Sequence, residues 1–393
     1  MPQAYIVAAA RTAGGRRGGA LRDWHPADMA GEMLDALVAR AGIDPAAIED
    51  VIMGCVGQAG EQAFHIGRNA VLASSLPISV PAVSIDRQCG SSQQAIQFAA
   101  QAVMSGTQDV VIAAGVESMT RVPMGLPFTL PLQHGIGTGP FSRRIQERFG
   151  VKSFSQFDGA EAIAGKYGLA KEALDLFALD SHCKAARASE EGAFDAEIVP
   201  LAVTGEDGAE RLHVRDEGIR FDATLEGIAA VEPIREGGRI TAANASQICD
   251  GASGVLVVSE AALKAHGLVP MARIVNLTVT GGDPVIMLEE IIPATRRALQ
   301  RAGMRIEEID LYEVNEAFAP VPLAWLGATG ADPARLNVHG GAIALGHPLG
   351  ASGTKLMATL LHALRRRGGR YGLQTMCEGG GLANVTIVEN LAR

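Results

Sequence analysis

The sequence is poor in aromatic and charged residues, and both shortages constrain its fold. Only 4% of the 393 residues are aromatic and 20% are charged, whereas 48% are hydrophobic and 47 residues are glycine. A core of this composition must be built from small aliphatic side chains in close packing. A chain of this length holds about two to three domains and can bury a sizeable core without metals or disulfides. The composition favours an α/β fold and argues against collagen, coiled coils and disorder.

The sequence also lacks an excess of basic residues, a cysteine pattern and a long apolar run. The net charge of −9 argues against nucleic-acid binding, because neutralising phosphates needs a basic face. The 5 cysteines form no C-x-x-C pair and no ladder typical of secreted proteins, so we expect reduced thiols in a cytoplasmic protein. The apolar segment 5–10 precedes an arginine cluster, the wrong order for a signal peptide, and no run suits a membrane span. No Cys/His cluster has metal-ligand spacing, so no metal is expected.

The chain contains a repeat. Segment 2–7 resembles segment 270–275, and Arg-Ala-Gly at 40–42 recurs at 301–303 after a similar amphipathic pattern. The helix and strand patterns after Cys89 match those after Gly350, and segment 251–258 resembles segment 381–388. Since the matches follow the same order, the sequence predicts two copies of one unit, the first of which holds a long insertion.

The repeat predicts an α/β protein with two duplicated halves stacked in layers around a shared central layer. We predict an N-terminal half over 1–116 plus 250–269, an inserted loop domain over 117–249, and a C-terminal half over 270–393. Because strands alternate with helices, parallel sheets covered by helices are expected. The insert begins with a long irregular stretch rich in proline and glycine, followed by two helices over 160–167 and 171–191. Such insertions usually cover a site or bind a ligand.

Cys89 lies where a strand over 83–85 gives way to a helix. A sulfur near a helix N-terminus favours the thiolate, because the macrodipole and the free amides lower the pKa of a thiol. This placement indicates a nucleophile; the alternative is a structural cysteine, because buried cysteines are common core residues. We interpret the cysteines at 55, 183 and 249 as structural.

Three further motifs carry side chains suited to catalysis. His347 stands between a glycine and a proline just before a helix, so a tight loop presents its ring as a base or an oxyanion donor. Cys377 heads a run of three glycines after a strand, and glycine lets backbone amides approach a ligand closely. Asn315 ends another strand, where its amide can hold a water molecule. The alternatives are a buried structural histidine, a plain glycine turn and a helix cap.

The sequence contains, in this order, Cys89, Asn-Glu-Ala-Phe at 315–318, Gly-His-Pro at 346–348 and Cys-x-Gly-Gly-Gly at 377–381. Together, these motifs resemble those of the thiolase family over essentially the whole chain. The resemblance implies a thiolase-like fold. It also implies that Cys89 is the nucleophile that carries the acyl group, that His347 activates it, and that Cys377 acts as base and acid toward the second substrate.

The resemblance further implies two oxyanion holes. One would consist of His347 and a water molecule held by Asn315, and the other of the backbone amides of Cys89 and Gly379. Both are needed because the cleavage forms an enolate oxygen and an acyl-cysteine. Glu316 would order Asn315.

Coenzyme A becomes the shared substrate, and no metal, nicotinamide or flavin is required. The resemblance places Ser246 beside the pantetheine arm and Arg220 near the nucleotide end, and we expect the insert to bind coenzyme A. A helix start is the alternative for Ser246, and solvated surface is the alternative for Arg220. A basic cluster over 143–152 is a further candidate for the phosphates. Thiolases are generally dimers or dimers of dimers, so a homodimer or homotetramer is expected.

The segment 155–161 lacks the His-Met-Gly of biosynthetic acetoacetyl-CoA thiolases and instead presents Phe157, which we expect to contact the substrate. This resembles bacterial degradative thiolases, including those acting on steroid side chains. The expected reaction is thiolytic cleavage of a 3-oxoacyl-CoA by CoA, giving acetyl-CoA or propionyl-CoA and a shortened acyl-CoA. The alternatives are an acetoacetyl-CoA thiolase in biosynthetic condensation and a non-catalytic acyl-CoA binding protein. A ketosynthase would have a histidine in place of Cys377.

Overall fold

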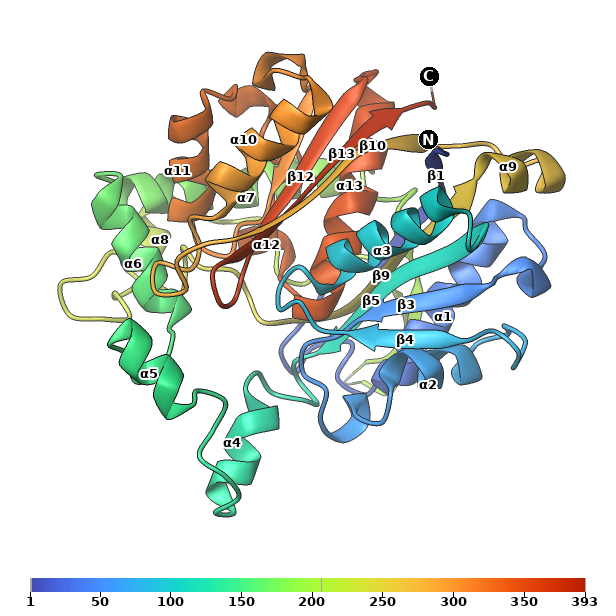
Figure 1. Cartoon of the computed structure of the whole chain (residues 1–393). Coiled ribbons are helices and arrows are strands. Elements are labelled where there is room, and N and C mark those ends of the chain that lie inside the picture. Colours follow the sequence, from blue (N-terminus) through green and yellow to red (C-terminus); the bar gives the residue numbers. More distant parts are fainter. Residues whose placement is uncertain (1, 206, 393) are drawn as a thin grey trace.

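Two similar halves and an inserted segment make up the structure (Figure 1), a computed structural model that describes all residues except 1, 206 and 393. The strands of the N-terminal half are β1 (Ala4–Thr12), β2 (Gly15–Arg16), β3 (Asp50–Gly54), β4 (Ala82–Ile85), β5 (Val110–Ser118) and β9 (Cys249–Ser259). Its helices are α1 (Pro26–Ala41), α2 (Ile66–Ala73), α3 (Ser91–Ser105) and α9 (Glu260–His266), with short 3-10 turns at Pro45–Ala47 and Gly60–Gln62.

The C-terminal half repeats this pattern. Its strands are β10 (Ala272–Gly281), β11 (Leu311–Val314), β12 (Tyr371–Glu378) and β13 (Leu382–Asn390). Its helices are α10 (Ile291–Ala302), α11 (Pro320–Thr329), α12 (Ala342–Leu345) and α13 (Ser352–Arg367), with 3-10 turns at Ile306–Glu308, Pro333–Arg335 and Leu349–Ala351. The insert holds α4 (Leu126–Gln133), α5 (Arg143–Phe149), α6 (Gln156–Lys166), α7 (Lys171–Glu190), β6 (Ile198–Val199), β7 (Leu201–Thr204), β8 (Glu210–His213) and α8 (Leu225–Ala229).

Counted outward from the junction between the two halves, the strands of both halves follow the same order. The N-terminal half has the order β4-β3-β5-β9-β1, and the C-terminal half has the order β10-β13-β12-β11. β1 pairs with β10 through Tyr5 and Ile6, so the two sheets join at these strands. β3, β5, β9 and β1 therefore correspond to β11, β12, β13 and β10, and the duplication predicted from the sequence is confirmed.

The two halves share even their irregularities. The pairing of β1 with β9 shifts register between Ile6 and Ala8, and the pairing of β10 with β13 shifts between Ile274 and Asn276. α1 is followed by Gly42 with φ 66° and α10 by Gly303 with φ 65°, a left-handed conformation that favours glycine at a helix end. A bulge and a helix stop thus recur at matching positions of both copies.

The sheets are mixed, so the prediction of parallel sheets is wrong. β3 runs parallel to β4 and β5, and β11 runs parallel to β12. β9 is antiparallel to β5 and β1, and β13 is antiparallel to β12 and β10. The reason is that a short glycine turn over 379–381, rather than a helix, joins β12 to β13, and a tight turn can join only antiparallel strands. In the N-terminal half, the insert separates β5 from β9 in sequence, but the two strands remain antiparallel, as β12 and β13 are.

Helices and sheets alternate in layers, with α3 and α13 in the middle (Figure 1). Ala99 and Val103 of α3 share one core with Met357 and Leu361 of α13 and with residues from strands of both halves. α1 and α2 pack in a separate core of the N-terminal half, and α10 packs in one of the C-terminal half. The shared central layer predicted from the sequence is confirmed.

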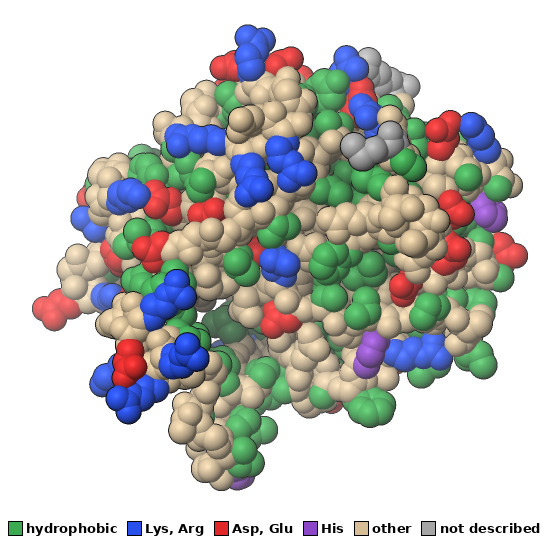
Figure 2. Space-filling model, in the orientation of Figure 1, with side chains coloured by type: hydrophobic (Ala, Val, Ile, Leu, Met, Phe, Trp, Pro, Cys, Tyr) green, Lys and Arg blue, Asp and Glu red, His purple; other side chains and the backbone are tan. Residues whose placement is uncertain are grey.

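The insert is more regular than the sequence indicated. The stretch expected to be irregular contains α4 and α5. Pro127 stands in the first turn of α4, where its missing N–H breaks no hydrogen bond, and the helix also accommodates Pro131 in its interior. The expected helical pair is confirmed as α6 and α7. α4 buries none of its residues, and Phe128 and Leu130 are 45% and 44% exposed. Figure 2 shows apolar side chains on the lobe that carries α4. None of the described helices combines the length and the apolar composition that a membrane-spanning segment requires.

Candidate active site

The predicted catalytic residues gather where the N-terminal ends of α3 and α13 meet. Cys89 stands two residues before α3, and His347 lies in the loop before α13. The backbone N–H of Thr354 donates to the hydroxyl of Ser92 at 3.0 Å, and Gly353 lies so close to Gln93 that a side chain would overlap its backbone. The central layer therefore brings the start of a helix from each half into contact.

The turns that carry the two cysteines lie against each other. A Cβ added to Gly379 would stand 2.9 Å from the side-chain oxygen of Gln88, and one added to Gly90 would overlap the carboxyl of Glu378. Burial raises the pKa of Cys377 well above its ordinary value, and the proximity of the Cys89 sulfur, which disfavours a second negative charge, raises it further. The glycines are thus required for the close approach of the turn after β12 to the turn before α3.

Cys89 does not rest as a thiolate, so the prediction of a lowered pKa is wrong. Burial, followed by the charge of Glu378, raises the pKa of Cys89 to about 12. The helix N-terminus is not sufficient, because desolvation disfavours the charged form and a carboxyl group stands nearby. Cys89 consequently needs a base to become a nucleophile.

His347 has the protonation state that such a base requires. Its Nδ1 lies 2.5 Å from the hydroxyl of Ser352, and that hydroxyl donates its own hydrogen to the carbonyl of Pro348 at 2.8 Å. The hydroxyl oxygen must therefore accept a hydrogen from Nδ1, which leaves the lone pair on Nε2. This buried Nε2 has no hydrogen-bond partner among the described residues. Burial, with the charge of Lys355 in second place, lowers the pKa of His347 to about 3, so the ring is neutral.

Lys355 fixes the loop that presents His347. Its Nζ donates to the carbonyl oxygens of Leu345 at 2.5 Å and Gly346 at 3.1 Å, the two residues directly before His347. It also lies 3.9 Å from Asp216. Burial lowers the pKa of Lys355, while the charge of Asp216 opposes that shift. Lys355 is a positioning residue because it acts through the backbone of the histidine loop.

Asn315 is buried, and neither end of its amide has a hydrogen-bond partner among the described residues. It lines an internal cavity of about 10 Å³ together with Gly346 and Ser352, the neighbours of His347. Glu316 does not order this amide, contrary to the sequence prediction. Its carboxylate instead accepts hydrogen bonds from Ser181, Asn337 and Ile343.

A cavity of about 460 Å³ brings His347 together with Ser246 and Phe157. Ser246 does not begin a helix, so that alternative is wrong: it lies in the segment before β9, and its N–H donates to the carbonyl of Ala317 at 3.0 Å. Neither Cys89 nor Cys377 is among the residues that line the described part of this cavity.

Arg220 lies in an adjoining cavity of about 220 Å³, beside His182. Ala242 and Gln247 line both cavities, so the two cavities adjoin at these residues. The expected basic cluster is part of neither: its Arg143 pairs with Glu147 one turn along α5. Within the described chain, no group of three or more His, Cys, Asp or Glu side chains is arranged to hold a metal ion.

The sequence matches two family models in tandem. Residues 4–261 match the thiolase N-terminal domain, and residues 268–390 match the thiolase C-terminal domain. The chain belongs to the thiolase family. This thiolase is therefore an acyltransferase, and the resemblance seen in the sequence motifs is confirmed.

Individual relatives agree with the family. The chain is 52% identical over 393 residues to the steroid 3-ketoacyl-CoA thiolase FadA6 of Mycobacterium tuberculosis, which covers 100% of this chain and 95% of that protein. It is 39% identical to the 3-ketoacyl-CoA thiolase of Citrobacter koseri, with 100% of both chains covered. The solved structure of Bacillus anthracis acetyl-CoA acetyltransferase superposes with a TM-score of 0.91 at 36% identity, and the match covers 100% of this chain and 99% of that chain. The solved structure of human mitochondrial 3-ketoacyl-CoA thiolase superposes with a TM-score of 0.89 at 35% sequence identity, and the match covers 99% of each chain.

Sequence reasoning missed three residues of the site. Ser352 and Lys355 lie within nine positions of His347, and Lys355 is the single charged residue in an otherwise uncharged helical stretch over 351–361. A lone cation in such a stretch is a signal that it is buried and has a specific partner. Glu378, between Cys377 and the glycine run, is fully buried and has one carboxyl oxygen without a partner among the described residues.

Proposed function

We propose that this thiolase cleaves a 3-oxoacyl-CoA with free CoA and releases acetyl-CoA or propionyl-CoA and a shortened acyl-CoA, in fatty-acid or steroid side-chain degradation. The observation that carries the proposal is the protonation state of His347: its ring is neutral, and its Nε2 has no hydrogen-bond partner among the described residues. His347 also lines the cavity that Ser246 and Phe157 line. Two relatives, a steroid 3-ketoacyl-CoA thiolase at 52% identity and a 3-ketoacyl-CoA thiolase at 39% identity, support thiolysis of a 3-oxoacyl-CoA by their names.

In the first half-reaction, His347 takes the proton of the Cys89 thiol, and the sulfur attacks the 3-keto carbonyl carbon. The bond between C2 and C3 breaks, which leaves an acyl group on Cys89 and an enolate on the departing thioester. Cys377 gives its proton to the enolate carbon. The raised pKa of Cys377 supports this role, because it keeps the thiol protonated before the reaction.

In the second half-reaction, the Cys377 thiolate takes the proton of the incoming CoA thiol. The CoA sulfur attacks the acyl carbon, and Cys89 leaves as a thiolate that recovers its proton from His347. The enolate oxygen would be stabilised by His347 and a water molecule held by Asn315, whose cavity has roughly the volume that one water needs. The second oxyanion would bind the backbone N–H groups of Cys89 and Gly379, which donate to no other described residue.

We place the pantetheine arm of CoA beside Ser246 and Phe157, and its nucleotide near Arg220. The shared wall of the two cavities at Ala242 and Gln247 supports this path. CoA is then a substrate, and the proposed chemistry needs no further cofactor.

The test is to incubate the enzyme with a 3-oxoacyl-CoA in the absence of free CoA and to analyse it by mass spectrometry. We expect an acyl adduct on Cys89, and we expect Cys89→Ser to lower thiolysis by at least about 100-fold. Cys183→Ser, which removes an exposed thiol, is the matched control. Unchanged thiolysis in Cys89→Ser, or an adduct on another residue, would contradict the proposal.

The second candidate function is acetoacetyl-CoA thiolysis or condensation by the same groups. The structural similarity to an enzyme named acetyl-CoA acetyltransferase favours it. A panel of 3-oxoacyl-CoA thioesters of increasing length decides between the two, since a strong preference for acetoacetyl-CoA would reverse the ranking.

We also propose that this thiolase is a cytoplasmic homodimer or homotetramer. The five unpaired cysteines support a reducing compartment, and the exposed apolar residues of α4 support self-association. Sedimentation velocity measures the oligomeric state directly, and a monomer at micromolar concentration would contradict it.

A further inference from the structure

The cavity that contains His347 carries charge of one sign. Arg16 and Arg17 both line it, and none of its described lining residues is Asp, Glu or Lys. Much of the remaining wall is apolar and includes Met119, Met124 and Leu349. A hydrocarbon acyl group would use the apolar wall but would gain nothing from two guanidinium groups.

The turn that holds the two arginines is fixed by its backbone. The Glu217 carboxylate accepts the N–H of Arg16 at 3.0 Å and the N–H of Ala20 at 2.9 Å, and the N–H of Gly18 donates to the Thr120 hydroxyl at 2.9 Å. Gly18 has φ 67°, which favours glycine at this point of the turn. The turn therefore holds the backbone of both arginines in a fixed position at the edge of the cavity.

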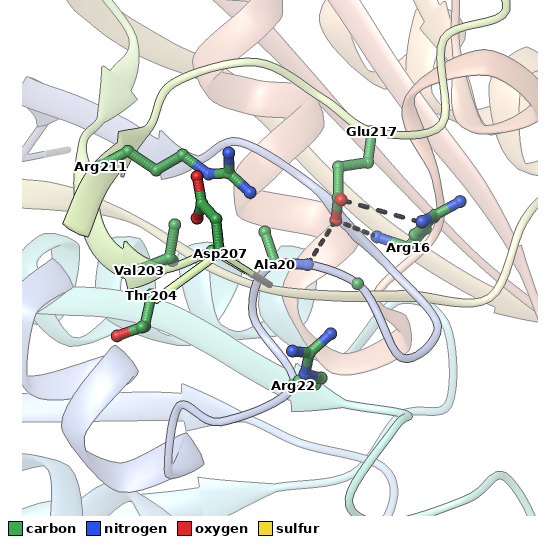
Figure 3. Close-up of a pocket in the computed structure, with 10 residues that line it drawn as sticks. Arg16, Ala20, Arg22, Val203, Thr204, Asp207, Arg211 and Glu217 are labelled. Atoms are coloured by element: carbon green, nitrogen blue, oxygen red, sulfur yellow. Dashed lines mark hydrogen bonds and ion pairs between the residues drawn. The ribbon is translucent and has the colours of Figure 1, made fainter. Parts of the chain in front are cut away.

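The two arginines differ in how far their charge is compensated. The Nε of Arg16 lies 3.8 Å from Glu217 Oε1, an interaction visible in Figure 3. Arg17 forms no hydrogen bond and no ion pair with any residue that the structure describes, and it is exposed. Its guanidinium is therefore available to an anion that enters the cavity.

The position of the arginines distinguishes the acyl end of the substrate from its CoA end. Ala242 and Gln247 lead from the cavity toward Arg220, where we place the nucleotide. Arg16 also lines another pocket of about 440 Å³, together with Arg22 and Arg211 and with the acidic Asp207 and Glu217 (Figure 3). A thioester substrate has two ends, so a CoA arm that extends toward Arg220 leaves the acyl chain to extend toward Arg16 and Arg17.

We propose that the acyl group cleaved by this thiolase ends in a carboxylate that Arg17 binds, with Arg16 beside it. The inference rests on the proposed thiolysis and names its substrate class, a 3-oxoacyl-CoA derived from a dicarboxylic acid. The planar fork of a guanidinium matches a carboxylate in two parallel hydrogen bonds. The apolar wall would cover the methylene chain between the thioester and the carboxylate.

The first experiment compares two thioesters of equal chain length, 3-oxooctanedioyl-CoA and 3-oxooctanoyl-CoA, which differ only at the far end of the acyl group. We expect kcat/KM to be at least about tenfold higher for the dicarboxylic probe, the effect of one charge-assisted pair in a partly enclosed site. Equal or reversed values would overturn the inference but leave the proposed function intact. Cleavage of neither thioester would contradict the proposed function itself.

The second experiment assigns the preference to Arg17. We expect Arg17→Gln to reduce the ratio of the two kcat/KM values to near one, and Arg17→Lys, which keeps a point charge without the fork, to retain part of it. Arg301→Gln, an exposed arginine of α10, is the control and should keep the ratio of the unmodified enzyme. If Arg17→Gln instead raises the KM for CoA and keeps the ratio, Arg17 binds the CoA phosphates and the inference falls.

Discussion

His347 owes both its orientation and its proton to residues of the helix that follows it. Ser352 accepts the hydrogen of Nδ1 and so leaves Nε2 as the acceptor, while Lys355 holds the two carbonyl groups that precede the ring. The same lysine places a positive charge near the imidazole, which helps to keep the pKa of His347 at about 3. Position and protonation of the base are thus coupled through one short segment.

The role of Lys355 can be tested by removing its charge. We expect Lys355→Met to lower kcat by roughly 10- to 100-fold, with a smaller change in KM, because the histidine loop loses its anchor. The acidic limb of the pH profile should move to higher pH, since the pKa of His347 rises when the neighbouring cation is removed. Lys355→Arg, which keeps the charge, should retain the original acidic limb. An unchanged kcat and an unchanged limb in Lys355→Met would exclude the positioning role.

The raised pKa of Cys89 predicts a steep pH dependence of its alkylation. In a Cys183→Ser background, which removes the exposed thiol, the rate of modification by iodoacetamide should rise about tenfold per pH unit between pH 7 and 9, because the thiolate fraction grows with pH up to a pKa of about 12. Peptide mapping of Cys89 measures this rate. A plateau below pH 8 would show that the resting enzyme already holds the thiolate.

At the scale of elements, the contact between α3 and α13 depends on glycine. Gly353 has no room for a side chain because the backbone of Gln93 lies against it, and the N–H of the next residue, Thr354, bonds to Ser92. This close crossing lets the two loops before the helices, which carry Cys89 and His347, approach each other. A wider crossing would separate the nucleophile from its base.

A substitution at the crossing should therefore affect stability and activity together. We expect Gly353→Ala to lower the free energy of unfolding by roughly 1–3 kcal/mol, the usual effect of overpacking, and to reduce thiolysis. Gly327→Ala is the matched control in α11, where a Cβ would meet no atom within 4 Å, and it should stabilise the protein by about 0.5–1 kcal/mol. Urea denaturation measures both changes, and equal stability in the two variants would contradict the role of the crossing.

At the scale of the whole molecule, a buried ion network joins both halves to the insert. Arg11 of β1 pairs with Glu197 at 2.6 Å and with both carboxylate oxygens of Asp216 at 2.7 and 3.0 Å. Thr359 of α13 donates to Glu197 at 2.9 Å, and Lys355 lies 3.9 Å from Asp216. The insert is therefore tied to the N-terminal half and to the helix that fixes the histidine loop.

Asp216→Asn should weaken this connection. We expect a loss of about 3 kcal/mol in the free energy of unfolding at pH 7, since the variant leaves Arg11 incompletely paired in a buried site. Burial raises the pKa of Asp216, but the charges of Arg11 and Lys355 outweigh it and hold the pKa below its ordinary value of 3.8. The contribution of the Asp216 carboxylate to the free energy of unfolding is thus complete above pH 3.8, the ordinary pKa. It is lost as the pH falls through the lower pKa of the folded state.

Thermal or urea unfolding at pH 7 and at pH 3 measures this effect, and the difference between Asp216→Asn and the unmodified protein should narrow at the lower pH. Asp180→Asn, which removes a surface pair with Lys184, should cost less than about 1 kcal/mol at either pH. A loss in Asp216→Asn that does not narrow toward pH 3 would point to lost packing rather than lost charge.

The motifs and the repeat could be predicted because they depend on residues that are close in sequence. The offset between similar segments identified both halves, and hydrophobic periodicity identified helices such as α6 and α7. Direction in the sheets could not be predicted in the same way. The turn over 379–381 is short enough to show that β12 and β13 form an antiparallel hairpin. β5 and β9 are also antiparallel, but the long insert between them removes the short turn from which this could be predicted.

The sequence by itself determined the family, the duplicated α/β architecture and the identity of the candidate reactive side chains, because each depends on local patterns. Only the tertiary structure decided their protonation and surroundings. The pKa of Cys89 depends on its burial and on Glu378 from the other half of the chain, and the charge of the cavity depends on a turn at Arg16 and Arg17 that lies far in sequence from His347. Desolvation and Coulomb interactions act through space, so residues distant in the sequence set them.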